Sequence, residues 1–236
     1  MGIKAFSMWN TRPQGTVQQI EPYRKYFFIC EGANTERWYF QKLIARRREL
    51  HIHSLIDICF LEKTEQDKDI TYPRQLVDFA ERQKTGKEIS FDPNRDKMVV
   101  IFDADIFANG KVLEYGELVK YAEEHEDILG VTNPSFELFL MLHYEDALTE
   151  TILPNESDIL RNEKEGRRTP IYRILQEKTN KNCKKNSAIG DLAELVEIAI
   201  EQEKQINQDI HVCLDQLTSN IGAIIDTIRK DVPVIA

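Results

Sequence analysis

The feature that most constrains the fold is a run of five apolar residues, Met98 to Phe102, which ends in Asp103-Ala104-Asp105. A strand with one exposed face alternates apolar and polar residues, whereas an unbroken apolar run is typical of a strand buried on both faces of a parallel sheet. In α/β proteins, ligands bind at the carboxyl ends of such strands. We therefore expect Asp103 and Asp105 in one crevice, where two carboxylates need a divalent metal, a shared proton or a cationic partner.

Similar apolar segments on both sides of this run alternate with segments that have one apolar helical face. The expected elements, in order, are a strand over residues 26–30, a helix over 35–48, a strand over 53–61, a helix over 71–84, the central strand, a helix over 113–124 and a strand over 128–131. The connections are long enough to join parallel strands. The pattern therefore predicts an α/β fold, with a parallel sheet flanked by helices, over residues 25–146.

The composition changes on both sides of this α/β domain. Residues 1–24 are polar and contain turn-forming residues, which predicts an irregular, loosely attached N-terminal arm. Residues 147–236 predict a mostly helical C-terminal extension packed on the sheet, with a polar, loop-rich stretch over 154–168. Its two longest helices are expected over residues 189–205 and 217–228.

The formal net charge of −9 argues against a protein that coats duplex DNA with a basic face. It does not argue against an enzyme that reaches phosphates through bound cations. No segment approaches the ~18 consecutive apolar residues of a membrane helix, and residues 1–10 lack the apolar region of a signal peptide, so we expect a soluble, cytoplasmic protein. The cysteines show no Cys-x-x-Cys spacing, which favours core positions in a reducing compartment.

Glu137 is the acidic exception in an otherwise apolar helix that is expected to follow Pro134. Asn133 can cap this helix, and Pro134 suits its first position. A buried carboxylate is unfavourable unless it is paired, protonated or bound to a metal. Two interpretations stay open: a glutamate that bonds back to the capping residue, and a residue of a functional site.

Glu31 follows the first predicted strand, so it is expected at the same sheet edge as Asp103 and Asp105. Three carboxylates of this kind suit Mg²⁺ or Mn²⁺, bound through few side chains and several waters. Such an ion can clamp a phosphodiester and activate a water molecule, and a nearby lysine, Lys184 or Lys185, could neutralise charge on the phosphate. The sequence contains no P-loop, G-x-S-x-G or H-E-x-x-H motif that would favour another chemistry.

The arrangement of Glu31-Gly32 after one strand and Asp103-x-Asp105 after another resembles the Toprim fold of topoisomerases, primases and OLD-family nucleases. The longer motifs that resemble the RloB-like family are Cys30-Glu31-Gly32-x-Asn34-Thr35-Glu36-x-x-Tyr39-Phe40, Phe102-Asp103-x-Asp105 and Asn133-Pro134-Ser135-Phe136-Glu137-Leu138-x-Leu140-x-Leu142-His143. The lysine-containing segment near residue 185 and the last helix are similar in order. The resemblance therefore spans most of the chain.

This resemblance implies a metal-dependent Toprim endonuclease that hydrolyses phosphodiester bonds of DNA or RNA in prokaryotic defence against phage. Relatives are commonly encoded beside an ABC-type or AAA-type ATPase that controls them, so such a partner is expected. By motif match, Glu31 is the Toprim glutamate, a metal ligand or general base, and Asp103 and Asp105 hold Mg²⁺ or Mn²⁺. Glu137 is implied to be the family's buried acid, as a second-site metal ligand, and Lys185 to be the phosphate-facing lysine.

The sequence departs from the family pattern just before this lysine. Asn182-Cys183 stands where an aromatic residue is expected. The choice between Lys184 and Lys185 as the phosphate-facing residue therefore stays open.

Two other functions also stay open. In a phosphatase of the haloacid dehalogenase type, Asp103 would be the nucleophile and Asp105 the acid, but Phe107 replaces the expected Thr or Val and Glu31 has no role. In a non-catalytic binding or adaptor module, the carboxylates would serve as caps. Resemblance of fold alone does not decide among these activities.

Overall fold

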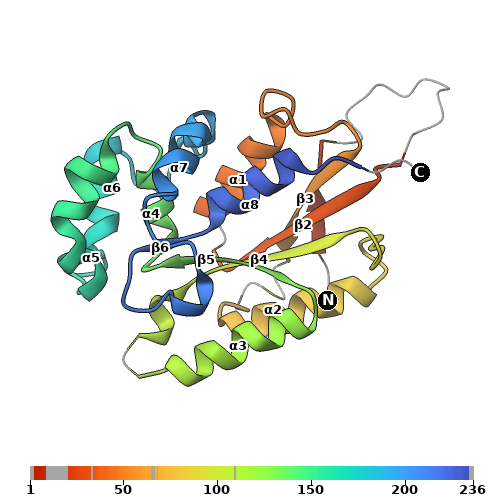
Figure 1. Cartoon of the computed structure of the whole chain (residues 1–236), viewed down its shortest axis with the longest axis horizontal. Coiled ribbons are helices and arrows are strands. Elements are labelled where there is room, and N and C mark those ends of the chain that lie inside the picture. Colours follow the sequence, from red (N-terminus) through yellow and green to blue (C-terminus); the bar gives the residue numbers. More distant parts are fainter. Residues whose placement is uncertain are drawn as a thin grey trace.

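The computed structural model describes residues 3–8, 21–32, 34–64, 67, 69–108 and 110–233. Within these residues, one six-stranded sheet runs through the molecule in the order β1-β3-β2-β4-β5-β6 (Figure 1). The strands are β1 (Ile3–Phe6), β2 (Arg24–Cys30), β3 (Ile56–Lys63), β4 (Lys97–Asp103), β5 (Ile128–Asn133) and β6 (Thr218–Ser219). Strands β2 to β5 pair in parallel, and β1 and β6 run antiparallel at the two edges. The predicted α/β class with a parallel core is confirmed.

Helices cover both faces of this sheet (Figure 1). The α-helices are α1 (Thr35–Ala45), α2 (Pro73–Thr85), α3 (Val112–Glu124), α4 (Phe136–Met141), α5 (Glu156–Arg161), α6 (Pro170–Thr179), α7 (Val196–Glu203) and α8 (Ile221–Lys230). Val99 and Ile101 of β4 pack in the core layer that contains α1 and α8. Met98, Val100 and Phe102 pack in the opposite layer, with α2 and α3. The unbroken apolar run is thus buried on both faces of the sheet, as the sequence predicts.

The edge strand β1 differs from the prediction that residues 1–24 form an irregular arm. Residues 3–6 pair antiparallel with residues 60–63 of β3. A segment this short carries too little periodicity to be recognised as a strand from its sequence. The pairing satisfies backbone groups at the edge of β3 that would otherwise be exposed. Residues 9–20 of the predicted arm lie outside the described residues.

The other edge strand, β6, replaces the start of the helix that the sequence predicts at residue 217. This strand pairs with the end of β5. The side chain of Asn220 then accepts a hydrogen bond from the N–H of Val131 at 2.7 Å and donates one to the carbonyl of Leu129 at 2.8 Å. Because this side chain continues the pairing along β5, α8 begins only at Ile221.

The C-terminal region also differs in detail from the prediction. The stretch 154–168, expected to be loop-rich, contains α5. The helix expected over 189–205 is divided into a 3-10 helix, Ser187–Leu195, and the α-helix α7. Gly190 lets the 3-10 helix lie directly on α1, because a Cβ at this position would be 2.5 Å from the carbonyl oxygen of Trp38.

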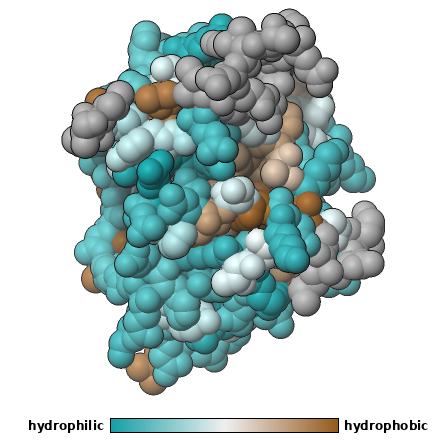
Figure 2. Space-filling model, turned by 90° about the vertical axis from the view of Figure 1, so that its right-hand side faces the viewer, coloured by the Kyte–Doolittle hydropathy of each residue, from teal (hydrophilic) through white to brown (hydrophobic). Residues whose placement is uncertain are grey.

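The start of β2 and the end of α8 lie at the same end of the molecule. Arg24, at the start of β2, forms an ion pair of 2.6 Å with Asp231, which follows α8. Figure 2 shows the surface at this end, which is mostly hydrophilic with a few hydrophobic side chains near its centre. Among the described residues, no helix has both the length and the apolar character that crossing a membrane requires.

Candidate functional site

A pocket of about 230 Å³ lies at the carboxyl ends of β2 and β4, the end opposite to the ion pair of Arg24. The residues that line it are Glu31, Gly32, Asn34, Thr35, Glu36, Asp103, Phe136, Glu137 and Lys184. Four of these residues carry carboxylates and one carries an ammonium group. The strand topology explains this concentration, because parallel strands bring their carboxyl ends, and the helices that follow them, to one edge of the sheet.

Glu31 directly follows β2 and is held on both its backbone and its side chain. Its carbonyl accepts a hydrogen bond of 2.7 Å from the ammonium of Lys63, which also donates to the carbonyl of Ile70 at 2.8 Å. Its carboxylate accepts from the N–H of Asp103 at 3.4 Å. Burial raises the pKa of Glu31, and the negative charge of Asp105 raises it further.

Asp103 lies at the centre of the pocket and ties two other elements to the end of β4. One of its oxygens, Oδ1, accepts hydrogen bonds of 2.8 Å from both the hydroxyl of Thr132 and the N–H of Phe136. Burial raises the pKa of Asp103 well above its ordinary value, and the surrounding carboxylates of Glu137 and Glu36 add to this rise. A cation in the pocket would stabilise the ionised form of Asp103.

Glu137 combines the two interpretations that the sequence leaves open. The residue that caps α4 is Ser135, not Asn133, which belongs to β5. The Ser135 hydroxyl donates a hydrogen bond of 2.6 Å to Glu137. The other carboxylate oxygen of Glu137 lies 3.9 Å from the ammonium of Lys184. Glu137 thus bonds back to the capping residue and lines the pocket at the same time.

Asp105 is the predicted carboxylate that the structure places apart from the others. It lies in the 3-10 turn Ala104–Phe107 and is not among the residues that line the pocket. Its carboxylate accepts a hydrogen bond of 3.1 Å from the side chain of Asn162, which follows α5. Burial raises the pKa of Asp105, and the nearby positive charge of Lys164 opposes this rise. Asp105 therefore lies at the border between the pocket and the helical C-terminal region.

The two candidate lysines have different surroundings. Lys184 lines the pocket, and its ammonium lies 5.6 Å from the ring centre of Tyr172. Although burial lowers the pKa of Lys184, the carboxylates of Glu137 and Asp103 raise it above its ordinary value. Lys185 is exposed and does not line the pocket. Of the two residues, Lys184 is therefore placed to meet a ligand in the pocket.

Glu36 is a fourth pocket carboxylate to which the sequence analysis assigns no role. It lies in the first turn of α1, and burial, followed by the charges of Glu137 and Glu31, raises its pKa to about 7. A Cβ at Gly32 would lie 2.1 Å from a carboxylate oxygen of Glu36, so this glycine leaves the space that the side chain occupies. The signal that could have revealed Glu36 is its position in the first helical turn after a strand end, where a side chain faces the same sheet edge.

The pocket carboxylates fit an open Mg²⁺ or Mn²⁺ site that waters and substrate complete, and not a closed site made by protein side chains alone. Among the described residues, no three His, Cys, Asp or Glu side chains are arranged to hold a metal ion together. The pocket therefore does not form a closed, all-protein metal cage. Mg²⁺ in enzymes is usually held by one or two carboxylates, with waters and substrate phosphates as the other ligands. The carboxylates of Glu31, Glu36 and Asp103 around one pocket fit that open arrangement. Burial, and after it the charges of neighbouring carboxylates, raises their pKa values, and a bound cation would favour their ionised forms.

Comparison with known proteins matches a family model to most of the chain. A family model described as "RloB-like protein" matches residues 26–228, which include every pocket residue and all strands except β1. No curated protein and no solved structure matches the chain.

Proposed function

The chain belongs to the RloB-like family, and on this premise we propose that it is a metal-dependent nuclease of the Toprim type that hydrolyses phosphodiester bonds in DNA or RNA. The observation that carries the proposal is the convergence of four carboxylates and one lysine on a single pocket at the carboxyl edge of a parallel sheet. Oxygen ligands around an open pocket are typical of enzymes that act on phosphates through divalent metals.

Within this proposal, Glu31 and Asp103 would hold Mg²⁺ or Mn²⁺, with Glu36 and Glu137 beside them in the pocket and Asp105 at its border. The ion would supply Lewis acidity and a water molecule of lowered pKa. The protein contributes the positions of the ligands. Asp103 keeps its orientation through its bonds to Thr132 and Phe136, both of which are accepted by Oδ1, so Oδ2 would be the oxygen that binds the ion.

Lys184 has a separate part in the proposed reaction. Its ammonium, held 3.9 Å from Glu137, would neutralise the negative charge that grows on the phosphate oxygens as the phosphodiester bond breaks. In the alternative to its role as a metal ligand, Glu31, which lines the pocket and has a pKa raised by burial, would accept a proton from the attacking water.

The biological setting that we propose follows from the family. The protein would act in the cytoplasm as part of a defence against phage, and an ABC-type or AAA-type ATPase would control its activity. A site that cuts nucleic acid without strong sequence selection needs such control in a living cell.

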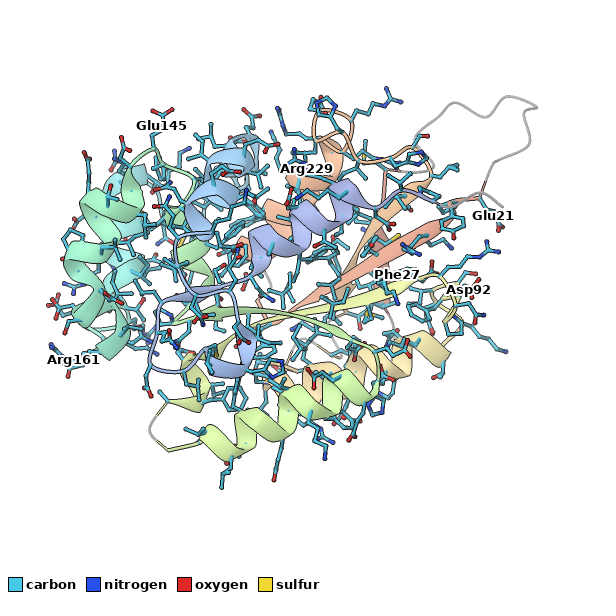
Figure 3. The ribbon with its side chains drawn as sticks, in the orientation of Figure 1. Glu21, Phe27, Asp92, Glu145, Arg161 and Arg229 are labelled. Carbon is cyan, nitrogen blue, oxygen red and sulfur yellow. The ribbon has the colours of Figure 1, made fainter. Side chains whose placement is uncertain are left out.

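The test of the proposed function is cleavage of plasmid DNA, single-stranded DNA and RNA by the full chain with Mg²⁺ or Mn²⁺, alone and with the ATPase encoded beside it. Wild-type protein is expected to cut at least one of these substrates, and Asp103→Asn to lose the activity. Asp92→Asn is a matched control. The Asp92 side chain is about half exposed to solvent and lies at the end of the molecule opposite to the pocket (Figure 3). Equal cleavage by wild type and Asp103→Asn, with both proteins folded, would refute the assignment.

The same experiment separates the alternatives. A phosphatase would release phosphate from a monoester and form an aspartyl-phosphate at Asp103. In a phosphatase, Asp105 would be the acid and would have to lie beside Asp103 in the pocket. The side chain of Asp105 instead bonds to Asn162 and does not line the pocket, which argues against a phosphatase. A binding module would cut nothing and would keep its partner when the pocket carboxylates are neutralised.

A further inference from the structure

The segment over residues 161–185 has a charge opposite to that of the rest of the chain. It contains nine lysines and arginines and three glutamates, which gives a net charge of +6. Because the whole chain has a net charge of −9, the remaining residues carry −15. The segment consists mainly of α6 and the turns on either side of it. A local concentration of positive charge on an acidic protein indicates a surface for a polyanion.

Several of these cations form no close ion pair in the described part of the chain, although Lys164 is near enough to Asp105 to oppose the rise that burial causes in the pKa of its carboxyl group. Arg161 and Arg173 form ion pairs with Asp158 at 3.1 Å and with Glu165 at 2.6 Å. The basic strip is defined as the residues Lys164, Arg167, Arg168 and Lys185, which are exposed and for which no ion pair is found among the described residues. An exposed cation that forms no close ion pair can contact an anionic ligand.

The basic strip borders the pocket on two sides. In the turn between α5 and α6, the side chain of Asn162 donates a hydrogen bond to Asp105, which places this turn next to the end of β4. In the turn after α6, the hydroxyl of Thr35 donates to the carbonyl of Cys183 at 3.1 Å and so fixes the turn to α1, with Lys184 in the pocket. Figure 1 shows α5 and α6 beyond the ends of the strands, and Arg161 lies at that end in Figure 3.

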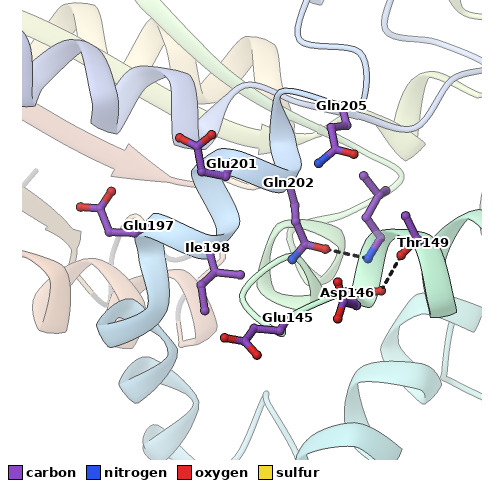
Figure 4. A pocket seen from close by; sticks show the side chains of 9 residues that line it. Glu145, Asp146, Thr149, Glu197, Ile198, Glu201, Gln202 and Gln205 are labelled. Carbon is purple, nitrogen blue, oxygen red and sulfur yellow. Dashed lines mark hydrogen bonds between the residues drawn. The ribbon is translucent and has the colours of Figure 1, made fainter.

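A neighbouring surface has the opposite character. A hollow of about 630 Å³ lies between α7 and the segment that follows α4. Figure 4 shows Glu145, Glu197 and Glu201 around this hollow, while Gln202 turns inward and accepts a hydrogen bond from the N–H of Leu148 at 2.8 Å. The carboxylates of this surface repel a polyanion. The basic strip therefore offers a polyanion a more favourable surface than this hollow does.

We propose that the basic strip holds the phosphate backbone of a polynucleotide as the strand enters the pocket. This inference rests on the proposed function, because it concerns the substrate of the same site. Lysine and arginine contacts with phosphates position a strand without reading its bases. Tyr172 is the sole aromatic residue in residues 161–185, and it is buried, so the segment offers no ring on which bases can stack. Binding on the strip is therefore electrostatic and tolerant of sequence.

The test measures how salt weakens the binding of labelled single-stranded RNA, single-stranded DNA and duplex DNA, by fluorescence anisotropy, with EDTA present so that no strand is cut. The strip variant is Lys164→Gln/Arg167→Gln/Arg168→Gln. The control variant, Arg48→Gln/Arg82→Gln/Lys87→Gln, removes the same charge at exposed positions outside the segment. Circular dichroism and thermal melting check that both variants are folded.

Each phosphate contact with a single strand steepens the slope of log K against log salt by roughly 0.7, so loss of three contacts is expected to flatten the slope by about 2. The control variant is expected to keep the wild-type slope. The probe that binds most tightly to the wild type identifies the source of the phosphates as RNA or DNA.

Several results would overturn the inference. Equal slopes for the wild type and the strip variant would do so, as would equal weakening by the control variant, or wild-type binding to none of the probes. If poly-glutamate displaces the labelled probe as well as unlabelled polynucleotide of equal total charge does, the ligand of the strip would be an acidic protein instead. If the wild type and the strip variant have equal slopes while Asp103→Asn loses cleavage, the role of the strip is refuted and the proposed nuclease stands. If the strip binds polynucleotide but no metal-dependent cleavage is found, the proposed nuclease is refuted and the role of the strip stands.

Discussion

The hydroxyl of Thr132 donates a hydrogen bond of 2.8 Å to Asp103, and this bond joins the ends of two neighbouring parallel strands. The same Asp103 oxygen accepts from the N–H of Phe136, where α4 begins. The central acid of the pocket is therefore oriented by the strand and the helix beside it. Residues outside the pocket can thus determine how Asp103 is oriented in it, and mutation of Thr132 tests this.

Thr132→Val keeps the shape of the side chain and removes its hydrogen bond to Asp103. We expect a loss of about 1–2 kcal/mol in the free energy of unfolding, because the buried Asp103 side chain loses one of its hydrogen bonds inside the protein. We also expect weaker Mn²⁺ binding, measured by calorimetry. Thr132→Ser keeps the hydroxyl and should behave as the wild type. If the Val and Ser variants bind Mn²⁺ equally, the bond does not orient Asp103.

Gly32→Ala places a methyl group where the carboxylate of Glu36 lies. The end of the Glu36 side chain can move, so the fold should survive while the carboxylate leaves the pocket. We expect Mn²⁺ affinity to fall about tenfold or more, as for other changes that displace groups around a metal. The control is Gly116→Ala in α3, where a Cβ meets nothing within 4 Å and stability should rise by about 1 kcal/mol. Unchanged metal affinity in Gly32→Ala would remove Glu36 from the site.

Lys184→Met and Lys185→Met distinguish the two candidate lysines. Both side chains are exposed, but Lys184 lines the pocket and faces Glu137, whereas Lys185 does not line the pocket. We expect Lys184→Met to lower the cleavage rate by about 100-fold, the usual cost of removing a group that stabilises transition-state charge. Lys185→Met should mainly change the salt dependence of substrate binding. The reverse order of effects on the rate would assign the catalytic role to Lys185.

His143 makes the stability of the fold depend on pH. It is fully buried, its Nδ1 bonds to the carbonyl of Phe139 at 2.9 Å, and its Nε2 bonds to the hydroxyl of Tyr39 at 2.9 Å. Nδ1 is therefore the donor and Nε2 the acceptor, which is the neutral form of the ring. Burial lowers the pKa of His143 to about 4, while in the unfolded chain it stays near its ordinary value.

The sign of this pH effect follows from proton binding. Between about pH 6.5 and pH 4 the unfolded chain binds a proton at His143 and the folded chain does not, so stability falls as the pH falls. The contribution of roughly 3 kcal/mol is fully present above pH 6.5 and is lost by about pH 4. Denaturant unfolding at several pH values should show a shallower decline for His143→Gln than for the wild type. Parallel declines would mean that His143 is already protonated in the fold.

Most of the central sheet could be predicted from the sequence because its signals are local. The apolar runs of β2 and β4 are long enough to identify buried strands, and each ends in the acid that the sheet topology then carries to the pocket. The positions of Glu31 and Asp103 at one edge follow directly from parallel pairing. Glu137 was recognisable because a carboxylate interrupts an apolar helix.

The remaining features depend on contacts between distant segments, which local patterns do not contain. β1 and β6 are too short to show periodicity and form because neighbouring strand edges need partners. Asp105 shares a motif with Asp103, yet the 3-10 turn after β4 directs its side chain to Asn162 instead. Glu36 reads as an ordinary polar residue of an amphipathic helix, and only the backbone path around Gly32 turns it into the pocket.

The edge strand β6 is made late in protein synthesis, so the sheet is completed late. Asn220 bonds to Val131 across 89 positions of sequence, and Lys184 joins a pocket whose first acid is Glu31. A ribosome therefore releases the acids of the pocket long before the lysine and the strand that completes the sheet beside β5. Until synthesis has passed these segments, the chain carries a pocket without its lysine and a sheet without β6. The pocket is therefore completed late, because it joins segments that lie far apart in the sequence.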